Sequence, residues 1–405
     1  MNTSGEKKID WVRKHMPLLS ILEEQLQSTT PFQNLTIAIC IHLEAKTARL
    51  AEVLVQGGAK VLLSSSNTLS TQDDVAIAVA EHGVQVFAKH GCTEAEYNTF
   101  LDQMLQQKPD IILDDGGDLT NLLHENYAQQ IPSMLGGCEE TTTGVIRLQS
   151  RYRQNQLQLP MILVNDAHSK YLFDNRYGTG QSVWTSIMNS TNLIVAGKKV
   201  VVSGYGWCGK GVASRAKALG ASVIVTEINP IKALEAHMDG FQVMTMEKAA
   251  PLGDIFITVT GCKEVISSSH FDLIKNNAIL CNAGHFNVEV DMKALELKTV
   301  SKKNVREHVS LHILDNGNQL HVLADGKLVN LASGDGHPAE IMDLSFALQI
   351  LSALYLVHNK LPIGLYPVPT SIDNQVASMK LHSLGLSIDQ LTPSQKDYLE
   401  SSFIH

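Results

Sequence analysis

Short apolar runs, rich in β-branched residues, alternate with stretches of helical spacing from residue 35 onward. In the first half of the chain the runs are residues 35–41, 60–66, 83–89, 110–115 and 161–166. Between the first two runs, residues 45–56 place apolar side chains at helical intervals and end at Gly57 and Gly58. This alternation of strands and helices predicts a parallel α/β sheet.

The alternation restarts near residue 198. Further strand-like runs are residues 198–206, 221–227, 254–261 and 278–284, and a helix is predicted to end at Ala218. We therefore expect an α/β protein with two Rossmann-like, doubly wound parallel sheets and a short helical C-terminal segment. The glycine-rich stretch 177–182 is the expected boundary between the two sheets.

Two later segments have a different pattern. Residues 339–359 predict a long helix that is apolar on all sides. We expect this helix to be buried on most sides, in the core or at a subunit contact. The stretch from about Ser371 is polar and helical, and we expect no core role for it.

Composition and charge exclude several classes of protein. The length of 405 residues predicts two or three domains, and the formal net charge of −9 argues against a nucleic-acid-binding surface. The six cysteines include no CxxC pair, so we expect neither a metal site nor a disulfide framework. No apolar run reaches the roughly 20 residues that span a bilayer, and the first residues lack the apolar core of a signal peptide. We expect a cytoplasmic protein without a membrane partner.

A glycine motif follows the strand-like run at residues 198–203. The sequence GYGWCG fits GxGxxG: Gly204 permits a tight turn, Gly206 lets a pyrophosphate approach the backbone, and Gly209 lets a helix pack on the strand. Glu227 ends the next strand, where an acid binds a ribose diol and repels a 2′-phosphate. The spacing predicts an NAD site. The resulting domain assignment is 1–180 with 337–385 for the substrate, 181–336 for NAD, and 386–405 for a C-terminal segment.

Polar residues stand at the carboxyl ends of the predicted strands in the first half. His42, Asp115 and Asn165 each follow an apolar run, and Lys170 and Asp174 come soon afterwards. Each residue alone fits a helix cap, a turn or a solvated ion pair. Because ligands of open parallel sheets bind beyond the carboxyl ends of the strands, the set together favours a substrate site. Spacing leaves open whether the lysine is a surface residue or a base tuned by burial.

Eight segments of the chain match the motifs of one known family. They are STQDD (70–74), DDGGDLTNL (114–122), EETTTGV (139–145), FDNRYGTGQS (173–182), GYGWCGKG (204–211), VTGC (259–262), NAGHFNVE (282–289) and LVNLASGDGHP (328–338). In this order they resemble the adenosylhomocysteinase family over nearly the whole chain. The resemblance implies reversible hydrolysis of S-adenosyl-L-homocysteine: NAD-dependent 3′-oxidation, 4′-proton abstraction, elimination of homocysteine, water addition and re-reduction.

The matched motifs imply roles for individual residues. Lys170 and Asp174 handle the 3′-hydroxyl and its proton, Asp115 serves the 4′ proton, and His42, Asp115 and His285 serve the leaving sulfur and the attacking water. The implied substrate contacts are Glu44, Lys46, Ser70, Thr71, Gln72, Glu140, Asp335 and His337. The implied cofactor contacts are Thr141, Thr142, Thr143, Asn175, Gly204, Gly206, Trp207, Cys208, Gly209, Glu227, Asn282 and Asn330.

One end of the implied substrate site, the base-reading end, contains the positions that contact the purine base in the family, and there this chain departs from the family pattern. After the first strand the commoner members have the pattern H-x-T-x-E/Q, whereas this chain has Glu44 and Lys46 at the last two specified positions. Two residues before the histidine that corresponds to His337, the commoner members have methionine and this chain has Asp335. A lysine ammonium is a pure donor, which suits the 6-oxo group of hypoxanthine, while a carboxylate could accept from adenine's amine or hypoxanthine's ring N–H. We expect adenine to be the base that is recognised, with S-inosyl-L-homocysteine as the alternative substrate. In a blander interpretation, Lys46 only pairs with Glu44 or Asp335 and adenine is still recognised.

Two further expectations rest on the resemblance. Many members end in a lysine- and tyrosine-containing tail that reaches the neighbouring subunit's NAD, and this chain ends instead in Phe403, Ile404 and His405, as in a bacterial and archaeal branch. We expect more exchangeable NAD and a homotetramer, a dimer of dimers. The rivals are an ordinary NAD-dependent dehydrogenase, which would release NADH, and a silent regulatory relative. A silent relative need not retain the whole set of Asp115, Glu140, Lys170, Asp174 and His285.

Overall fold

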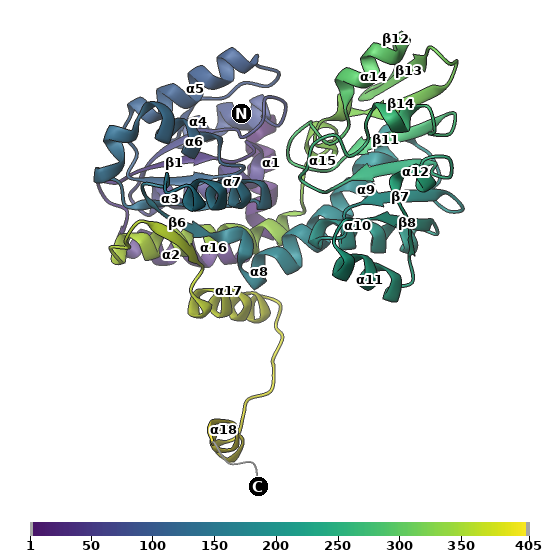
Figure 1. Ribbon diagram of the computed structural model, residues 1–405. Coiled ribbons are helices and arrows are strands. Elements are labelled where there is room, and N and C mark those ends of the chain that lie inside the picture. Colours follow the sequence, from purple (N-terminus) through teal and green to yellow (C-terminus); the bar gives the residue numbers. More distant parts are fainter. Residues whose placement is uncertain (1–2, 402–405) are drawn as a thin grey trace.

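The computed structural model describes residues 3–401 as two α/β bodies that lie side by side (Figure 1). Each body has one sheet with helices packed on both faces. The predicted α/β class with two Rossmann-like sheets is confirmed. The last residues, Phe403, Ile404 and His405, on which the expectation of exchangeable NAD rests, lie outside the described residues.

The first sheet has seven strands, all parallel, in the order β15-β6-β5-β4-β1-β2-β3. The strands are β1 (Thr36–Cys40), β2 (Lys60–Ser64), β3 (Gln85–Val86), β4 (Ile111–Asp114), β5 (Gly136–Glu139), β6 (Pro160–Leu163) and β15 (Gly364–Pro367). The chain runs outward from β1 on one side and from β4 on the other. The crevice beyond the carboxyl ends of β1 and β4 is therefore where such a sheet binds ligands.

Alternate side chains of these strands face opposite layers of helices, as the pleat requires. Ile37, Ile39 and Ile111 pack into one core with the N-terminal and C-terminal helices, whereas Ala38 and Ile112 face the other core. The first layer contains α1 (Ser4–His15), α2 (Pro17–Thr29), α3 (Ala45–Gln56), α4 (Asp73–Glu81), α16 (Ala339–His358) and α17 (Thr370–Ser383). The second contains α5 (Glu94–Gln106), α6 (Asp118–Asn126) and α7 (Thr142–Arg153).

The second sheet has eight strands in the order β12-β13-β14-β11-β10-β7-β8-β9. The strands are β7 (Lys199–Ser203), β8 (Ser222–Thr226), β9 (Gln242–Val243), β10 (Ile255–Thr258), β11 (Ala278–Asn282), β12 (Thr299–Arg306), β13 (Val309–Leu314) and β14 (Gln319–Leu323). Strand β13 is antiparallel to both of its neighbours, so this sheet is mixed rather than purely parallel as predicted. Its helices are α10 (Trp207–Ala218), α11 (Pro230–Met238), α12 (Met246–Ala249), α13 (Ser268–Phe271), α14 (Met292–Lys298) and α15 (Val329–Ala332).

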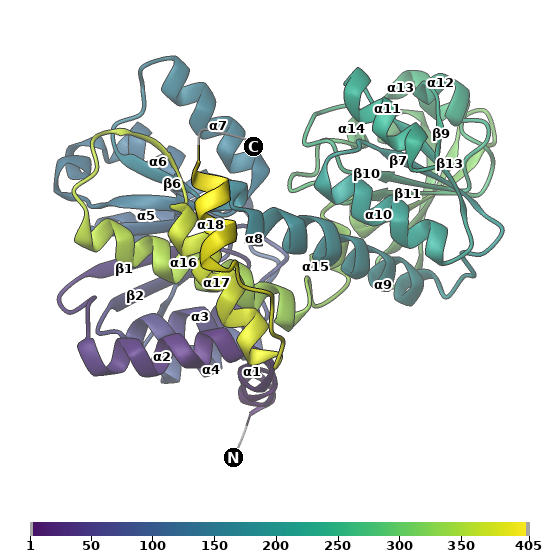
Figure 2. The ribbon, with the colours of Figure 1, turned by 90° about the horizontal axis from the view of Figure 1, so that it is seen from below.

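The glycine-rich stretch 177–182 lies inside a helical run that joins the two bodies. Helix α8 (His168–Lys170), a π-helical segment (Tyr171–Gly178) and α9 (Thr179–Thr191) follow one another without a break, and Figure 2 shows them crossing between the bodies. A Cβ on Gly180 would lie 2.7 Å from the carbonyl oxygen of Gly211, and one on Gly178 would lie 3.0 Å from the His337 ring. These glycines therefore permit close packing rather than a loop.

The apolar helix α16 is buried inside the first body, as predicted. It contacts α2, α3, α17 and β5, so its apolar surface is used within the chain. Contrary to the expectation that no apolar run is long enough to span a bilayer, α16 is long and apolar enough to do so, the one such helix among the described residues. Its burial is typical of a core helix. Helix α17 also packs on α16 and buries Val376, contrary to the expectation of no core role. Helix α18 (Pro393–Glu400) buries no residue and lies away from both bodies (Figure 1).

Candidate active site

A cavity of about 1160 Å³ lies between the two bodies and is lined by both. All five predicted catalytic residues line it: His42, Asp115, Lys170, Asp174 and His285. So do Glu44, Lys46, Glu140, His337, Thr141, Thr142, Thr143, Asn175, Gly204, Gly206, Trp207, Cys208, Glu227 and Asn330. The structure thus brings most of the predicted site together in one space.

The glycine motif provides a surface suited to a dinucleotide. Gly204 has a φ of +101° at the turn after β7, and a Cβ on Gly206 would meet nothing within 4 Å, so the backbone here is open to a ligand. A Cβ on Gly209 would lie 2.0 Å from the Gly204 carbonyl oxygen, so Gly209 serves helix packing and does not line the cavity. The free N–H groups at the start of α10 favour an anionic pyrophosphate. These residues fit NAD.

Glu227 follows β8 at the rim of this surface. Its carboxylate accepts hydrogen bonds from the backbone N–H groups of Tyr205 (2.7 Å), Ile228 (2.7 Å) and Asn229 (3.0 Å). Burial alone would raise the pKa of Glu227, but these N–H donors outweigh it and hold the pKa below its usual value. An ionised carboxylate beside the glycine turn suits a free ribose diol and repels a 2′-phosphate.

Lys170 is the centre of a buried polar cluster. Its Nζ donates to Asn175 Oδ1 at 2.8 Å and lies 3.5 Å from Asp174 Oδ1 and 3.6 Å from Glu140 Oε1. Burial alone would lower the pKa of Lys170, but the two carboxylates outweigh it, so the pKa is raised and the side chain is an ammonium. Lys170 is therefore not a surface residue, and its raised pKa is the opposite of the lowered pKa of a base tuned by burial.

Asp174 lies between Lys170 and His337. It accepts from Ser345 Oγ at 2.6 Å, and its Oδ1 lies 2.9 Å from His337 Nδ1. Burial alone would raise the pKa of Asp174, but Lys170 and His337 overcome it and lower the pKa well below its usual value. His337 in turn shares a 3.2 Å hydrogen bond with Thr179 Oγ1 through Nε2. The ring of His337 therefore links Asp174 to Thr179, the first residue of α9.

A second cluster joins both bodies through Asp115. His42 Nε2 lies 3.4 Å from Asp115 Oδ2, and His285 Nδ1, from the second body, lies 3.8 Å from Asp115 Oδ1. Asp115 Oδ1 is buried and has no hydrogen-bond partner, so it is free to accept one from a ligand. Burial lowers the pKa of His42 to about 4 despite Asp115, so His42 is neutral at pH 7.

Glu140 faces the Lys170 cluster from the end of β5. Its Oε2 accepts from Gln349 Nε2 at 2.5 Å, whereas its buried Oε1 has no hydrogen-bond partner. Burial raises the pKa of Glu140 to about 7, with Lys170 opposing the shift. A buried acceptor oxygen that faces the cavity is suited to a ribose hydroxyl.

The raised pKa of Glu140 predicts an acid limb in the pH profile. Below pH about 7 a protonated Glu140 no longer offers a carboxylate, so we expect kcat/KM to fall about tenfold per pH unit. Glu140→Gln should be less active at neutral pH and should lack this limb. Profiles of kcat/KM between pH 5 and 9 for both proteins test this, and an unchanged limb in Glu140→Gln would assign it to another group.

The base-reading end holds Glu44, Lys46 and Asp335. Lys46 Nζ donates to Glu44 Oε2 at 2.5 Å and to the Asp335 carbonyl oxygen at 2.8 Å, and both Lys46 and Glu44 line the cavity. The Asp335 side chain points elsewhere, accepting from Gln72 Nε2 at 3.2 Å, and Asp335 does not line the cavity. Lys46 thus pairs as the blander interpretation states, but it also keeps a third N–H on a lining side chain.

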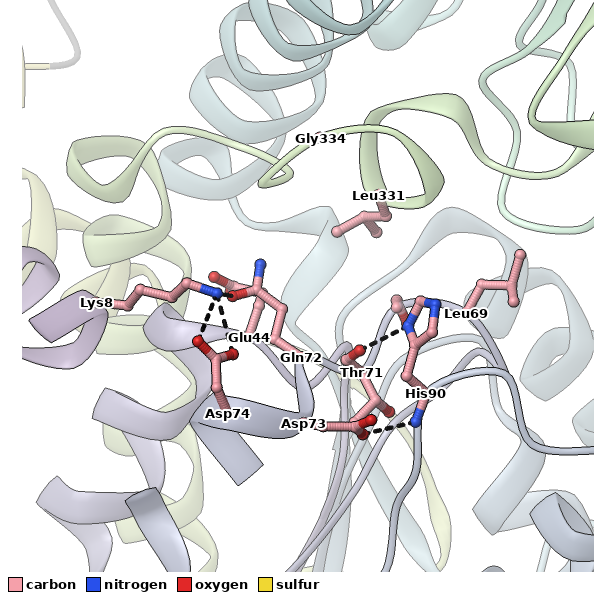
Figure 3. Close-up of a pocket in the computed structure, with 11 residues that line it drawn as sticks. Lys8, Glu44, Leu69, Thr71, Gln72, Asp73, Asp74, His90, Leu331 and Gly334 are labelled. Carbon is pink, nitrogen blue, oxygen red and sulfur yellow. Dashed lines mark hydrogen bonds and ion pairs between the residues drawn. The ribbon is translucent and has the colours of Figure 1, made fainter. Parts of the chain in front are cut away.

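Ser70, Thr71 and Gln72 line a neighbouring pocket of about 270 Å³ and not the large cavity (Figure 3). Lys8 Nζ donates there to Gln72 and Asp74, each at 3.0 Å. Ser70 Oγ lies 2.7 Å from His42 Nδ1, so it positions the histidine from behind. Asn282, another predicted contact, is also absent from the cavity lining: its amide donates to the Gly284 and Phe286 carbonyl oxygens and shapes the loop that carries His285.

Two polar residues of α16 contact the cluster but were not predicted. Ser345 donates to Asp174 and Gln349 donates to Glu140. They stand four residues apart and so share one face of the helix. Polar residues at helical spacing in an otherwise apolar helix are the signal that could have found them.

Comparison with known proteins agrees with this architecture. The family described as S-adenosyl-L-homocysteine hydrolase matches residues 1–135, and the NAD-binding domain of the same family matches residues 175–336. The chain is 53% identical to the S-inosyl-L-homocysteine hydrolase of Methanocaldococcus jannaschii over 98% of this chain and 96% of that protein. It is 52% identical to the adenosylhomocysteinase of Thermotoga maritima over 99% of this chain and all of that protein.

Among solved structures, a dipicolinate synthase from Bacillus halodurans shares the fold. Its TM-score is 0.51 at 13% identity, covering 81% of this chain and all of that one. The sequence relatives identify a hydrolase, and the match over residues 175–336 identifies NAD as its cofactor. The chain belongs to the S-adenosyl-L-homocysteine hydrolase family.

Proposed function

We propose that the chain catalyses the reversible hydrolysis of S-adenosyl-L-homocysteine to adenosine and L-homocysteine. The carrying observation is that one cavity places the glycine motif, the Lys170 cluster and the Asp115 cluster around a shared space. Oxidation of the ribose 3′ carbon acidifies the 4′ hydrogen, and loss of that proton allows homocysteine to be eliminated from the 5′ carbon. When bound, NAD⁺ supplies reversible hydride transfer at the ribose 3′ carbon.

The Lys170 cluster is proposed to act on the 3′-hydroxyl. The Lys170 ammonium donates to the 3′ oxygen and stabilises negative charge there, while Asp174 holds the ammonium in place. Glu140 orients the ribose hydroxyls through its Oε1, which accepts no hydrogen bond from the protein. Because its pKa lies near 7, Glu140 is also the group of this cluster best matched to holding a proton.

The Asp115 cluster is proposed to act on the neighbouring carbon and on the leaving group. A 3′ ketone acidifies the 4′ hydrogen, and the unpaired Oδ1 of Asp115 is available to take that proton. Together with His285, the neutral His42 flanks Asp115, and the two rings direct the departing sulfur and the entering water. Closure of the two bodies over the cavity would exclude water while the ketone exists.

The decisive experiment measures homocysteine thiol release from purified holoprotein. We expect thiol release without net NADH formation, and loss of turnover when the cofactor is stripped. An ordinary dehydrogenase would instead form NADH in proportion to product. Thiol release by cofactor-free protein at the holoprotein rate would contradict the proposal.

The position of Lys46 favours S-inosyl-L-homocysteine as a second candidate substrate. Two of its three ammonium N–H groups donate to Glu44 and Asp335, which leaves a third N–H on a side chain that lines the cavity. The 6-oxo group of hypoxanthine accepts such a donor, and Glu44 can accept the ring N–H beside it. The similarity to the Methanocaldococcus jannaschii enzyme supports the same substrate.

Replacing Lys46 by methionine tests how the base is recognised. We expect Lys46→Met to reduce kcat/KM for the inosyl substrate by about tenfold or more, since a charge-assisted hydrogen bond is lost, and to harm the adenosyl substrate less. Thiol release from both substrates, for both proteins, gives the ratio. Equal losses on the two substrates would remove Lys46 from base recognition.

Three further features are part of the proposal. We place the domain boundaries at 180/181 and 336/337, because the strands of the first sheet lie on the outer side of both positions. We propose a cytoplasmic homotetramer, by analogy with the family. Because α16 is covered within the chain, the subunit contacts are expected on other surfaces, and light scattering with cross-linking would measure the assembly.

A further inference from the structure

Two loops that carry catalytic side chains meet across the cleft between the bodies. Asp115 opens the bend 115–117 that leads into α6 of the first body, and His285 lies on the loop 283–289 of the second. A Cβ on Gly116, whose φ is +102°, would lie 2.3 Å from His285 Nε2. The histidine therefore rests against the bare backbone of the bend, and the Asp115–His285 pair exists only while the bodies are together.

Arg147, on α7, contacts both loops. Its Nη1 donates to the Gly116 carbonyl oxygen at 2.7 Å and to Asp118 Oδ1 at 2.6 Å. The guanidinium carbon lies 4.7 Å from the centroid of the Phe286 ring. A guanidinium can donate hydrogen bonds in its plane while its face covers an aromatic ring, so one side chain serves the two contacts at once.

The loop that carries Phe286 is anchored at its base in the second body. Asn282 Nδ2 donates to the Phe286 carbonyl oxygen at 2.9 Å, and Glu289 accepts from the N–H groups of Thr260 and Gly261. The Phe286 ring packs edge-on against His285 with centroids 4.7 Å apart. A contact that fixes the Phe286 ring from across the cleft therefore also restricts the position of the His285 ring.

We propose that Arg147 is a positioning residue that couples closure of the cleft to assembly of the Asp115–His285 pair. This inference rests on the proposed function, because it assigns the pair to the elimination stage. Without the Arg147–Phe286 contact the loop tip is released, and His285 is no longer held against Gly116. The Lys170 cluster, which Arg147 does not touch, keeps its geometry.

The test compares Arg147→Met, Arg147→Lys and Phe286→Leu with Arg151→Met. Arg151 is the matched control, because it lies one turn further along α7 and contacts Asn121 and Glu125 of the first body. We expect Arg147→Met to reduce kcat/KM about 10- to 100-fold, as a small misplacement of reacting groups does. Substrate-induced reduction of the bound cofactor, read at 340 nm, should proceed at the wild-type rate, and Arg147→Lys should recover part of the loss.

A double variant separates positioning from general damage. The double variant with Arg147→Met and Phe286→Leu should lose no more kcat/KM than the worse single variant, because both substitutions remove the same contact between Arg147 and Phe286. Fully additive losses, a loss equal to that of Arg151→Met, or an equal loss of the 340 nm signal would overturn the inference. A wild-type protein that fails to hydrolyse the thioether would instead refute the proposed function, so the two failures are distinguishable.

Discussion

Lys170→Met is expected to reduce thioether hydrolysis by about 10³-fold, within the range for loss of a positioned acid–base group. The ammonium is buried, with Asn175, Asp174 and Glu140 within 3.6 Å. Methionine fills a similar volume but cannot donate to the 3′ oxygen. Because this step precedes the others, the variant should also fail to reduce its bound cofactor on adding substrate, which absorbance at 340 nm would show.

Loss of a buried cation also destabilises the protein, so a stability control is needed. Lys380 pairs at 2.9 Å with the buried carboxylate of Asp343, between α17 and α16 and outside the cavity lining. Lys380→Met should lower the melting temperature in the same way, since either change removes a lysine from a buried carboxylate, at a cost of about 3–5 kcal/mol. Its folded fraction should keep normal turnover. Activity of Lys170→Met above a tenth of wild type would remove Lys170 from the reaction.

The sequence pattern predicts strands where burial requires apolar side chains. Strand β1 carries Ile37 and Ile39 into one core and Ala38 into the other, so its residues form a continuous apolar run. Strand β5 gives no such signal, because Gly136 and Gly137 occupy two of its four positions. A Cβ on Gly136 would lie 2.6 Å from the Pro160 carbonyl oxygen, and one on Gly137 would lie 2.8 Å from Met161 Sδ. Close strand packing therefore removes the pattern that predicts strands.

The candidate site divides in the same way. His42 and Asp115 follow neighbouring strands, and the strand-end rule alone indicates them. His285 comes from the second body, and nothing in local spacing predicts its 3.8 Å approach to Asp115. Ser345 and Gln349 of α16 stand at helical spacing in an otherwise apolar helix, which marks them as unusual but does not identify Asp174 and Glu140 as their partners. Contacts between side chains that lie far apart in the sequence thus require either a structure or a family resemblance.

Asp115→Asn is expected to separate the two stages of the reaction. Hydrolysis should fall about 10³-fold, because an amide oxygen cannot take the 4′ proton. The Lys170 cluster is untouched, so adding substrate should still reduce the bound cofactor, and absorbance at 340 nm should rise and persist. Exchange of the 4′ hydrogen with solvent deuterium, followed by mass spectrometry, should be lost.

Ser66→Ala is the matched control for this variant. Ser66 Oγ donates to Asp115 Oδ2 at 3.2 Å, so its removal perturbs the same carboxylate without changing its capacity to accept a proton at Oδ1. We expect a loss of about 10- to 100-fold, the value of one hydrogen bond to a charged group, which stays well short of the loss expected for Asp115→Asn. Deuterium exchange at the wild-type rate in Asp115→Asn would assign the proton to another base. Absence of the 340 nm signal would place Asp115 in the oxidation step as well, and the two clusters would then act as one unit rather than in sequence.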